Sequence, residues 1–376
     1  MGQKPSRVAV VNSAQTLFKP SWDDRQHVDL ITEAVVAALR GTGLRIDDVD
    51  FVIDSGSDFL DGRSISNCGF LGAMGAHHKE ESRVEDDGLW ALSYAANKIA
   101  SGSATVGLVI AYAKPSELDP RSYWCNLLEP FTQRPVGLDH YSAAALYGQR
   151  YLANAGLKPE DLGVVAQRAW QAAVRNPNVD LHEVPDTEEF WTTQVASPLR
   201  GSDFARPVDG AVAVLVAGAH VAETIASRPV WITGVGSAID QHFLAAREPD
   251  SLPACRAAAQ FAFRSTGASA QDFDVVEVSA NSTVGELMVL EALGLADRHK
   301  ALDLYRSSGV VAINPSGGAL PADPIMATGL ARLHEAVSRL DGRGSQAIDG
   351  ARRALVHGNG GFAMQNHCVV TMEVAA

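Results

Sequence analysis

An internal repeat is the feature that most constrains the fold. The segments ALRGTGLRIDDVDFVID (38–54) and AFRSTGASAQDFDVVEV (262–278) start 224 residues apart. Each reads as a helix ending on a Thr-Gly cap, a short acidic loop and a β-branched strand. Upstream, the amphipathic stretch 27–39 matches 252–263, and the strand-like stretch 7–14 matches 229–238. Each half therefore predicts a strand, a helix, a strand and a further helix, which is a layered α/β fold.

A stretch with a different pattern separates the two halves. The first half continues with a predicted helix at 88–101 and a strand at 106–113, and the second with a helix at 327–340 and two closing strands. Residues between them are rich in proline, and a structureless connection of that length would be unusual. We therefore predict an inserted lid or substrate-binding subdomain. The predicted division is 1–114, the first part of the N-terminal half; 115–210, the inserted loop domain; 211–229, a closing strand and linker; and 230–376, the C-terminal half.

The charge balance narrows the possible partners and the compartment. With 31 Lys and Arg against 44 Asp and Glu, the formal charge is −13, which would repel nucleic acid and an anionic membrane surface. The first residues run straight into a strand pattern, and no run of 18 apolar residues occurs. We therefore expect neither a signal peptide nor a membrane span, and a cytoplasmic protein. The four cysteines have no paired spacing, which disfavours a zinc site and a disulfide framework.

Several long motifs follow one another along the chain. They are LGVVAQRAWQAAVRNP (162–177), SPLRGSDFARPVDGAVAVLVA (197–217) and LMVLEALGL followed by INPSGGALPADPIMATGLARLHEA. Together, and in this order, they resemble the thiolase superfamily, in particular the sterol-carrier-protein-x type thiolases and their relatives. The resemblance covers essentially the whole chain. It implies the thiolase fold, a five-layer α-β-α-β-α core made from two repeated halves with an inserted loop domain. It also implies a dimer, either of this chain or with a second thiolase-like chain.

The positions of thiolytic chemistry differ from the family pattern. Thiolases use a cysteine at the start of a buried helix, where the helix dipole and backbone N–H groups favour the thiolate. Counting back from IASG (99–102), that position falls at Glu85, within two or three residues. Asp323 stands in place of the family's Gly-His-Pro histidine, and Val356 and His357 stand at the second cysteine. The resemblance therefore implies that covalent acyl transfer through sulfur has been lost.

Three consecutive acids, Glu85, Asp86 and Asp87, precede the glycine that opens the predicted helix. One carboxylate is enough to cap a helix. Three buried together would repel one another and lose hydration unless they were paired or protonated. Two hypotheses stay open for each acid: it faces a catalytic cavity, or it turns away to accept N–H groups or to pair with arginines.

Other candidates have a structural alternative as well. His357 lies in the glycine-rich HGNGG and is either a general acid or base or a structural histidine. Asp323 precedes a helix start and is either a cap or catalytic, and His140 and Tyr141 either line a pocket or pack in the core. The remaining substrate-binding candidates lie in the matched motifs and glycine-rich loops: Asn281, Ser316, Gly317, Asn359 and Gly360, with Arg121, Arg134 and Arg200 as candidates for phosphate contact.

Carboxylates and imidazole without a nucleophilic sulfur suit non-covalent carbon–carbon chemistry. In a retro-aldol step a base takes the β-hydroxyl proton, the bond breaks, and hydrogen-bond donors hold the thioester enolate. Steroid side-chain aldolases, relatives that lack the thiolase cysteine, act this way with a small zinc-ribbon and OB-fold partner. We therefore expect an acyl-CoA lyase of lipid metabolism that cleaves a β-hydroxyacyl-CoA with a steroid or branched side chain and works with such a partner. We expect no metal and no cofactor beyond the coenzyme A of the substrate.

Two alternative functions stay open. A catalytically inactive thiolase-like subunit of an acyl-CoA-processing complex would also have lost its catalytic residues, and a neighbouring thiolase gene with intact cysteines would favour it. An acetyl-CoA acyltransferase would need an atypical nucleophile, such as Cys68 or Cys125 reaching the site from a loop. Inactivation by iodoacetamide, with protection by substrate, would favour that alternative.

Overall fold

The computed structural model describes residues 6–307, 311–342 and 346–375. Its core is a ten-stranded sheet in the order β10-β9-β11-β12-β8-β1-β7-β4-β2-β3. The strands are β1 (Val8–Gln15), β2 (Phe51–Ser55), β3 (Glu80–Val84), β4 (Val106–Ala113), β7 (Gly210–Gly218), β8 (Val230–Ile239), β9 (Val275–Val278), β10 (Ala312–Ile313), β11 (Arg353–Gly360) and β12 (Asn366–Val374). Counted outward from the centre, β1-β7-β4-β2-β3 mirrors β8-β12-β11-β9-β10 strand for strand. The predicted repeat is confirmed.

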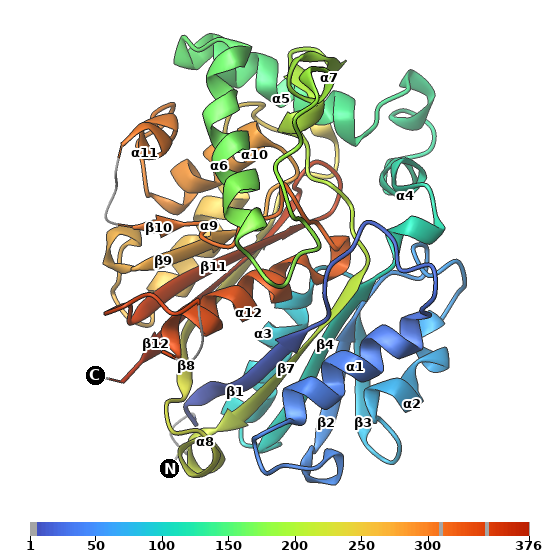
Figure 1. Ribbon diagram of the computed structural model, residues 1–376, viewed down its shortest axis with the longest axis vertical. Coiled ribbons are helices and arrows are strands. Elements are labelled where there is room, and N and C mark those ends of the chain that lie inside the picture. Colours follow the sequence, from blue (N-terminus) through green and yellow to red (C-terminus); the bar gives the residue numbers. More distant parts are fainter. Residues whose placement is uncertain (1–5, 308–310, 343–345, 376) are drawn as a thin grey trace.

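The two halves of the sheet meet where β1 pairs with β8, from Val8 opposite Ile232 to Val10 opposite Val230. Helices α3 (Gly88–Ala100) and α12 (Thr328–Leu340) pack against each other and contact strands of both halves. Helix α1 (His27–Leu39) covers the other face of the N-terminal half, and α9 (Pro253–Phe263) and α10 (Thr283–Leu293) cover that of the C-terminal half (Figure 1). The outer helices of each half, the two halves of the sheet and the central pair α3 and α12 therefore form five layers, as in the thiolase fold.

Small residues let the two central helices approach closely. A Cβ atom on Gly88 would stand 2.6 Å from Cγ of Leu330 in α12 and 2.8 Å from Cβ of Ala111 in β4. Neither neighbour can retreat in a close-packed core. The close contact sets the first turns of α3 and α12 side by side, and this is where the acid triplet lies.

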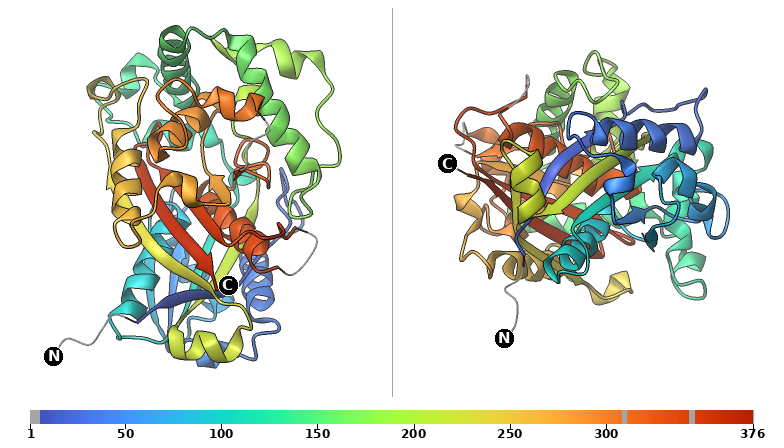
Figure 2. Two further views of the ribbon diagram at one scale, coloured as in Figure 1. Left: turned by 90° about the vertical axis from the view of Figure 1, so that its left-hand side faces the viewer. Right: turned by 90° about the horizontal axis from the view of Figure 1, so that it is seen from below.

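Residues 115–210 fold over one end of the core (Figures 1 and 2). They include α4 (Pro120–Asn126), α5 (His140–Ala155), α6 (Gly163–Val174), α7 (Glu188–Thr192) and the short hairpin of β5 (Gln194–Ala196) and β6 (Leu199–Arg200). Helix α5 packs on α10, and α6 packs on α11 (Leu302–Arg306). The α-helices of the described residues also include α2 (Leu71–Met74) and α8 (Ala219–Ile225). None of the helices in the described part of the chain is long and apolar enough to cross a membrane.

Candidate active site

A cavity of about 180 Å³ opens at the start of α3. Four separate segments line it: the acid triplet, α4 with the residue after it, the turn before α12, and the β11–β12 hairpin. The lining residues are Glu85, Asp86, Asp87, Tyr123, Trp124, Leu127, Ile325, Met326, Asn359, Gly360, Gly361 and Asn366. The chain therefore brings parts of both halves and of the predicted insertion to one point.

Asp87 caps two helices at once. Its Oδ1 accepts the backbone N–H of Leu89 in α3 at 3.0 Å, and its Oδ2 accepts that of Gly329 in α12 at 2.6 Å. A Cβ atom on Gly329 would stand 2.0 Å from Oδ1, and one on Gly358 would stand 2.5 Å away. Burial raises the pKa of Asp87 to about 8, while the two N–H donors act in the opposite direction. Both oxygens serve the backbone, so this acid holds the helix starts in place.

Replacing Asp87 with Ala is expected to lower the free energy of unfolding by about 2 to 4 kcal/mol, because two buried N–H groups lose their acceptor. Urea unfolding followed by circular dichroism measures the change. The matched control is Asp119→Ala, which removes the exposed cap of α4 and is expected to cost less than about 1 kcal/mol. Equal losses in the two variants would contradict the double cap.

Asp86 is partly buried and lines the cavity. Its Oδ2 accepts the side-chain N–H of Asn366 at 2.6 Å, and its Oδ1 accepts the backbone N–H of Asp87 at 2.9 Å. Burial raises the pKa of Asp86, and these two hydrogen bonds act against the rise. A Cβ atom on Gly360 would stand only 1.8 Å from Oδ1, so a glycine there makes room for the carboxylate. A carboxylate with a raised pKa beside a cavity is suited to proton transfer.

Glu85 turns outward from the same triplet. Its side chain is 51% exposed. Its Oε1 accepts the backbone N–H of Asp58 at 2.8 Å, and its Oε2 pairs with Nε of Arg83 at 3.3 Å. The three adjacent acids therefore have different environments: one caps helices, one faces the cavity, and one pairs with an arginine at the cavity mouth.

Tyr123 and Trp124 of α4 were not predicted from the sequence, and they form one wall of the cavity. The Tyr123 hydroxyl donates to Sδ of Met326 at 3.5 Å, and a thioether is a weak acceptor. Burial raises the pKa of Tyr123, and Asp86, as a nearby acid, acts in the same direction, so the hydroxyl keeps its proton. An adjacent aromatic pair in a proline-rich insertion was the available sequence signal.

The structure does not bring His357 into this cavity. Gly358, the next residue of β11, faces Asp87, and side chains alternate between the faces of a strand. His357 therefore lies on the opposite face, fully buried, with Nε2 2.9 Å from Nδ1 of His367. Asp323 is not among the cavity residues either. Its Oδ1 accepts the backbone N–H of Ile325 at 3.0 Å, and burial raises its pKa to about 6.

Some of the substrate-binding candidates predicted from the sequence line the cavity, and others do not. Gly360 and Asn359 line the cavity, and the Asn359 amide donates to Oγ of Ser279 at 2.8 Å. Ser316 lies instead in a buried ion-pair network, and a Cβ atom on Gly317 would stand 2.9 Å from a carbonyl oxygen of α6. The carbonyl of Asn281 accepts the backbone N–H of Ala205. Neither Ser316, Gly317 nor Asn281 lines the cavity.

His140 and Tyr141 stand behind the cavity wall. Their ring centroids are 3.9 Å apart, and the His140 ring lies 6.0 Å from that of Trp124. Burial lowers the pKa of His140 to about 4, so the ring is neutral. The three arginines considered for phosphate contact all have partners within the chain: Arg121 pairs with Asp139, Arg134 donates to two backbone carbonyls, and Arg200 pairs with Asp203.

No cysteine thiol lines the cavity, and all four cysteines lie in the described part of the chain. Cys68 is exposed, and the Cys125 thiol donates to the carbonyl of Leu138 at 3.7 Å. Cys368 lies beneath the first turn of α3, where its thiol donates to the carbonyl of Leu89 at 3.8 Å. Burial, with the two acids nearby, raises the pKa of Cys368 well above its usual value, so this thiol stays protonated.

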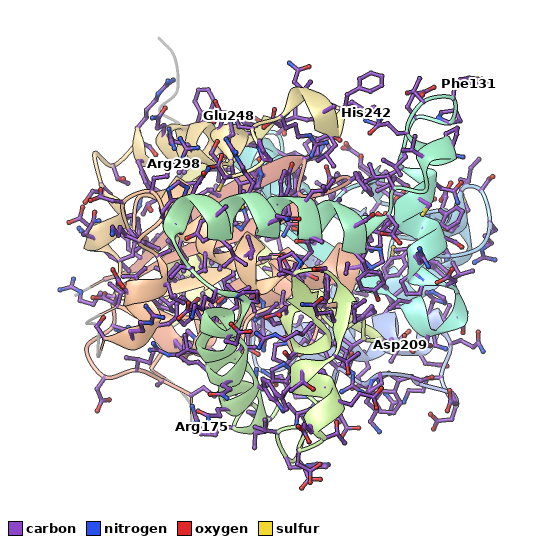
Figure 3. All side chains as sticks on the ribbon, turned by 90° about the horizontal axis from the view of Figure 1, so that it is seen from above. Phe131, Arg175, Asp209, His242, Glu248 and Arg298 are labelled. Atoms are coloured by element: carbon purple, nitrogen blue, oxygen red, sulfur yellow. The ribbon has the colours of Figure 1, made fainter. Side chains whose placement is uncertain are left out.

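A larger, apolar hollow of about 540 Å³ lies along α5 and shares no residue with the acid cavity. Its walls include Val136, Leu146 and Phe243, which are exposed. Figure 3, seen from above, shows α5 crossing the molecule, with the neighbouring Phe131 and His242 toward one edge. Apolar side chains on this face are therefore open to solvent in the isolated chain.

Comparison with known proteins gives a consistent set of relatives. Residues 236–373 match the family described as thiolase C-terminal domain-like. The chain is 27% identical over 370 residues to an acetyl-CoA acetyltransferase of Methanothermobacter thermautotrophicus, covering 94% of this chain and 96% of that protein. It is 26% identical over 379 residues to the 17-hydroxy-3-oxo-4-pregnene-20-carboxyl-CoA lyase of Mycobacterium tuberculosis, covering 93% and 95%.

One further relative and one solved structure of similar fold carry the name aldolase. The chain is 26% identical over 347 residues to the steroid side-chain-cleaving aldolase of Thermomonospora curvata, covering 86% of this chain and 85% of that protein. The solved Ltp2-ChsH2(DUF35) aldolase matches with a TM-score of 0.82 at 23% identity, covering 98% of each chain.

Proposed function

We propose that this chain cleaves a carbon–carbon bond of a β-hydroxyacyl-CoA without a covalent intermediate. The chain has the thiolase fold and resembles the steroid side-chain aldolase branch of the thiolase superfamily. One observation carries the proposal. Asp86 and Tyr123 both line the cavity at the start of α3, the Tyr123 hydroxyl donates there only to the weak acceptor Sδ of Met326, and no thiol lines the cavity.

The proposed reaction is a retro-aldol cleavage. Asp86 takes the proton of the β-hydroxyl, the oxygen forms a carbonyl, and the bond between Cα and Cβ breaks. The electron pair of that bond moves into the thioester, giving an enolate that the Tyr123 hydroxyl stabilises by a hydrogen bond. Asp86 then returns its proton to Cα. The products are a ketone or aldehyde and a shortened acyl-CoA.

The charge of the cavity supports this assignment. Among the described residues that line it, none is Lys or Arg, so an anionic enolate beside an ionised Asp86 would be repelled. When Asp86 takes the β-hydroxyl proton, its own charge disappears as the enolate charge forms. The total charge in the cavity therefore stays constant along the reaction, which avoids the cost of a second buried anion.

We further propose that the acyl group is bulky and steroid-like or branched, and that a small zinc-ribbon and OB-fold protein assists the reaction. The support comes from one relative named as a lyase of a steroid-type carboxyl-CoA, from one named as a steroid side-chain-cleaving aldolase, and from a solved aldolase named for two components, Ltp2 and ChsH2(DUF35). The assay should therefore contain this chain together with such a partner.

Tyr123→Phe is expected to lower kcat for cleavage by about 10- to 100-fold, because the enolate loses a hydrogen-bond donor. Release of the shortened acyl-CoA, followed by liquid chromatography, measures kcat. The control is Tyr94→Phe on the exposed side of α3, where no change is expected. If Tyr123→Phe left kcat unchanged, Tyr123 would not stabilise the enolate. The role of Asp86 would then have to be tested separately.

A further inference from the structure

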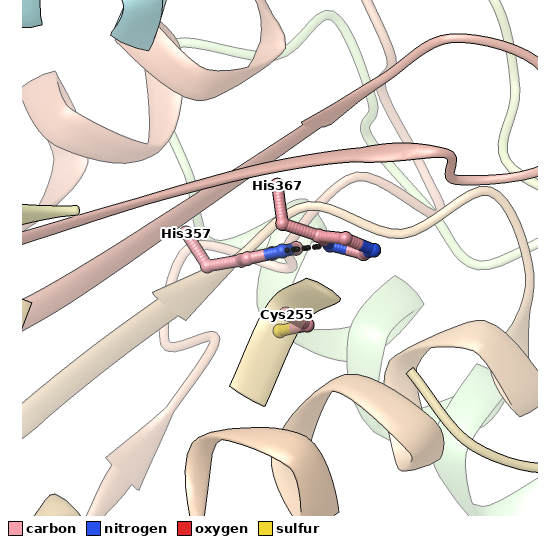
Figure 4. A group of neighbouring side chains, drawn as sticks. All are labelled: Cys255, His357 and His367. Atoms are coloured by element: carbon pink, nitrogen blue, oxygen red, sulfur yellow. Dashed lines mark hydrogen bonds between the residues drawn. The ribbon is translucent and has the colours of Figure 1, made fainter. Parts of the chain in front are cut away.

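Three metal-binding side chains meet in the core of the C-terminal half, away from the acid cavity. Cys255 comes from the first turn of α9, His357 from β11 and His367 from β12 (Figure 4). Each is 0% exposed, and their ligand atoms lie within 4.8 Å of one another. Asn359 pairs with His367 in the antiparallel ladder, so the two histidines are diagonal neighbours on one face. The proposed lyase mechanism uses none of the three.

The histidine nitrogens are incompletely satisfied. Nε2 of His357 and Nδ1 of His367 stand 2.9 Å apart, and the two outer nitrogens are buried without a hydrogen-bond partner in the described structure. Burial lowers the pKa of both rings, that of His367 to about 3, so each ring carries one N–H and one lone pair. A hydrogen bond between the inner nitrogens leaves one outer N–H and one outer lone pair unpaired, and unpaired buried polar groups destabilise the fold.

Backbone groups favour the opposite arrangement of protons. Although neither outer nitrogen has a hydrogen-bond partner in the described structure, the backbone of Ser279 near His357 and that of Met364 near His367 each act to raise the pKa of the ring against the effect of burial. If both outer nitrogens carry their protons toward these groups, the two inner lone pairs face each other. Metal-binding histidines have this arrangement, in which the outer N–H points to a backbone carbonyl and the inner nitrogen to the ion.

Cys255 supplies a third ligand from a favourable place. It is the third residue of α9, which opens with Pro253, and a helix N-terminus favours a thiolate. Burial raises the pKa of this thiol, so it keeps its proton until a cation compensates the charge. Binding a cation would release that proton.

The charge of the surroundings selects the cation. Arg247 lies near His367 and lowers its pKa, and its Nη1 donates to the carbonyls of Phe362 and Ala363. A divalent ion with one thiolate would leave a net positive charge in this closed core, next to the arginine, whereas a monovalent ion with one thiolate is neutral. Thiolate and imidazole are soft ligands that suit monovalent copper. We propose that Cys255, His357 and His367 bind one Cu⁺ ion through the thiolate and the two inner imidazole nitrogens.

The spacing of the ligands fits a single ion with a small adjustment. When two imidazole nitrogens each lie about 2.0 Å from one metal, they are about 2.8 Å apart if the nitrogen–metal–nitrogen angle is 90° and about 3.5 Å apart if it is 120°. The observed 2.9 Å lies within that range. The ligand atoms lie within 4.8 Å of one another, so the sulfur has to move toward the nitrogens to reach a metal–sulfur bond of about 2.3 Å. The ion would join α9 to the strand whose other face carries Gly358 and Gly360, the two glycines against Asp87 and Asp86.

Chelator competition tests the site. Full-length Cys68→Ser/Cys125→Ser protein, which lacks the two more accessible thiols, is loaded with Cu⁺ without oxygen and challenged with bathocuproine disulfonate. We expect one retained equivalent of copper per chain. Cys255→Ala and His367→Gln should each lower the retained copper at least tenfold, and the control His182→Gln, which changes a surface histidine, should not. X-ray absorption of the loaded parent protein should show one sulfur and two nitrogen ligands.

Three outcomes would overturn the site. The chelator could remove all copper from the parent protein, Cys255→Ala could retain as much copper as the parent, or the absorption spectrum could show a copper environment without sulfur. The last measurement needs no substitution in the cluster, so it stands even if the core variants fail to fold. Retention of Zn²⁺ under conditions where Cu⁺ is lost would overturn the assignment to a monovalent ion.

Discussion

Asp86→Asn is expected to lower kcat for β-hydroxyacyl-CoA cleavage by about 10²- to 10⁴-fold, with little change in the fold. The amide keeps the shape of the carboxylate but cannot take the β-hydroxyl proton, and the contribution of a general base is of this size. Substrate binding does not use that proton transfer, so KM should change far less than kcat. Steady-state kinetics of the chain with its partner measures both constants.

Glu85→Gln is the matched control, because it removes the neighbouring acid, which is exposed and paired with Arg83. We expect its kcat to stay within about threefold of the parent value, because Glu85 lies at the cavity mouth with its oxygens bound to Arg83 and Asp58 and takes no part in the proposed proton transfer. In the parent enzyme, kcat/KM should fall as the pH is lowered through the raised pKa of Asp86, since only the ionised carboxylate accepts the proton. If Asp86→Asn and Glu85→Gln had equal activity, Asp86 would not be the base.

Arg332→Met is expected to lower the free energy of unfolding by about 3 to 5 kcal/mol, the largest stability effect that we predict. Arg332 is 1% exposed, and its Nη1 stands 3.2 Å from Oε2 of the buried Glu277 and 2.6 Å from Oγ of Ser316. Removing one partner of a buried ion pair leaves the other charge uncompensated. Arg339 stands farther from Glu277, at 3.9 Å, and compensates only in part. Guanidinium unfolding gives the free energy.

An exposed ion pair is the control for this prediction. Arg306 pairs with Asp161 on the surface, with side chains 46% and 30% exposed, and Arg306→Met is expected to cost less than about 1 kcal/mol. A double variant, Arg332→Met with Glu277→Gln, should recover part of the loss because the uncompensated charge is gone. A loss in Arg332→Met no greater than in Arg306→Met would show that the buried network adds nothing to stability.

The fold could be predicted from the sequence because the signals for its helices and strands are local and occur in both halves of the chain. The predicted helix at 27–39 and the predicted strand at 106–113 have the bounds that the structure gives. Hydrophobic periodicity and Thr-Gly helix ends depend only on neighbouring residues. The same signals at the same spacing in the second half made the mirrored strand order predictable.

The different roles of the three acids in the triplet could not be predicted from the sequence, because they depend on contacts with distant residues. Asp87 is fixed as a cap by Gly329, and Asp86 is held by Asn366, both more than 240 positions along the chain. The hydrogen bond from Leu89 to Asp87 is local, but the second cap on Gly329 and the contact of Asp86 with Asn366 have no local signal. The separate surroundings of the three acids arise only when α12 and the β11–β12 hairpin pack against α3.

The position of His357 had a usable signal in the strand itself. Gly358 and Gly360 occupy alternate positions of β11, as expected for a face pressed against a helix start. His357 lies one position before Gly358, and side chains alternate between the two faces of a strand, so His357 lies on the other face of β11. Its cluster with Cys255 and His367 could not be found by motif spacing, because the three ligands come from a helix and two strands far apart in the sequence.

We propose that this thiolase-type framework works without a covalent sulfur intermediate. The intact mass of the enzyme, quenched with acid during steady-state cleavage of a β-hydroxyacyl-CoA in the presence of the partner, tests this proposal. We expect cleavage products with the protein at its unmodified mass, and a kcat within about twofold of the parent for Cys68→Ser/Cys125→Ser. A protein mass increased by the acyl group, mapped to any of the four cysteines, would contradict it.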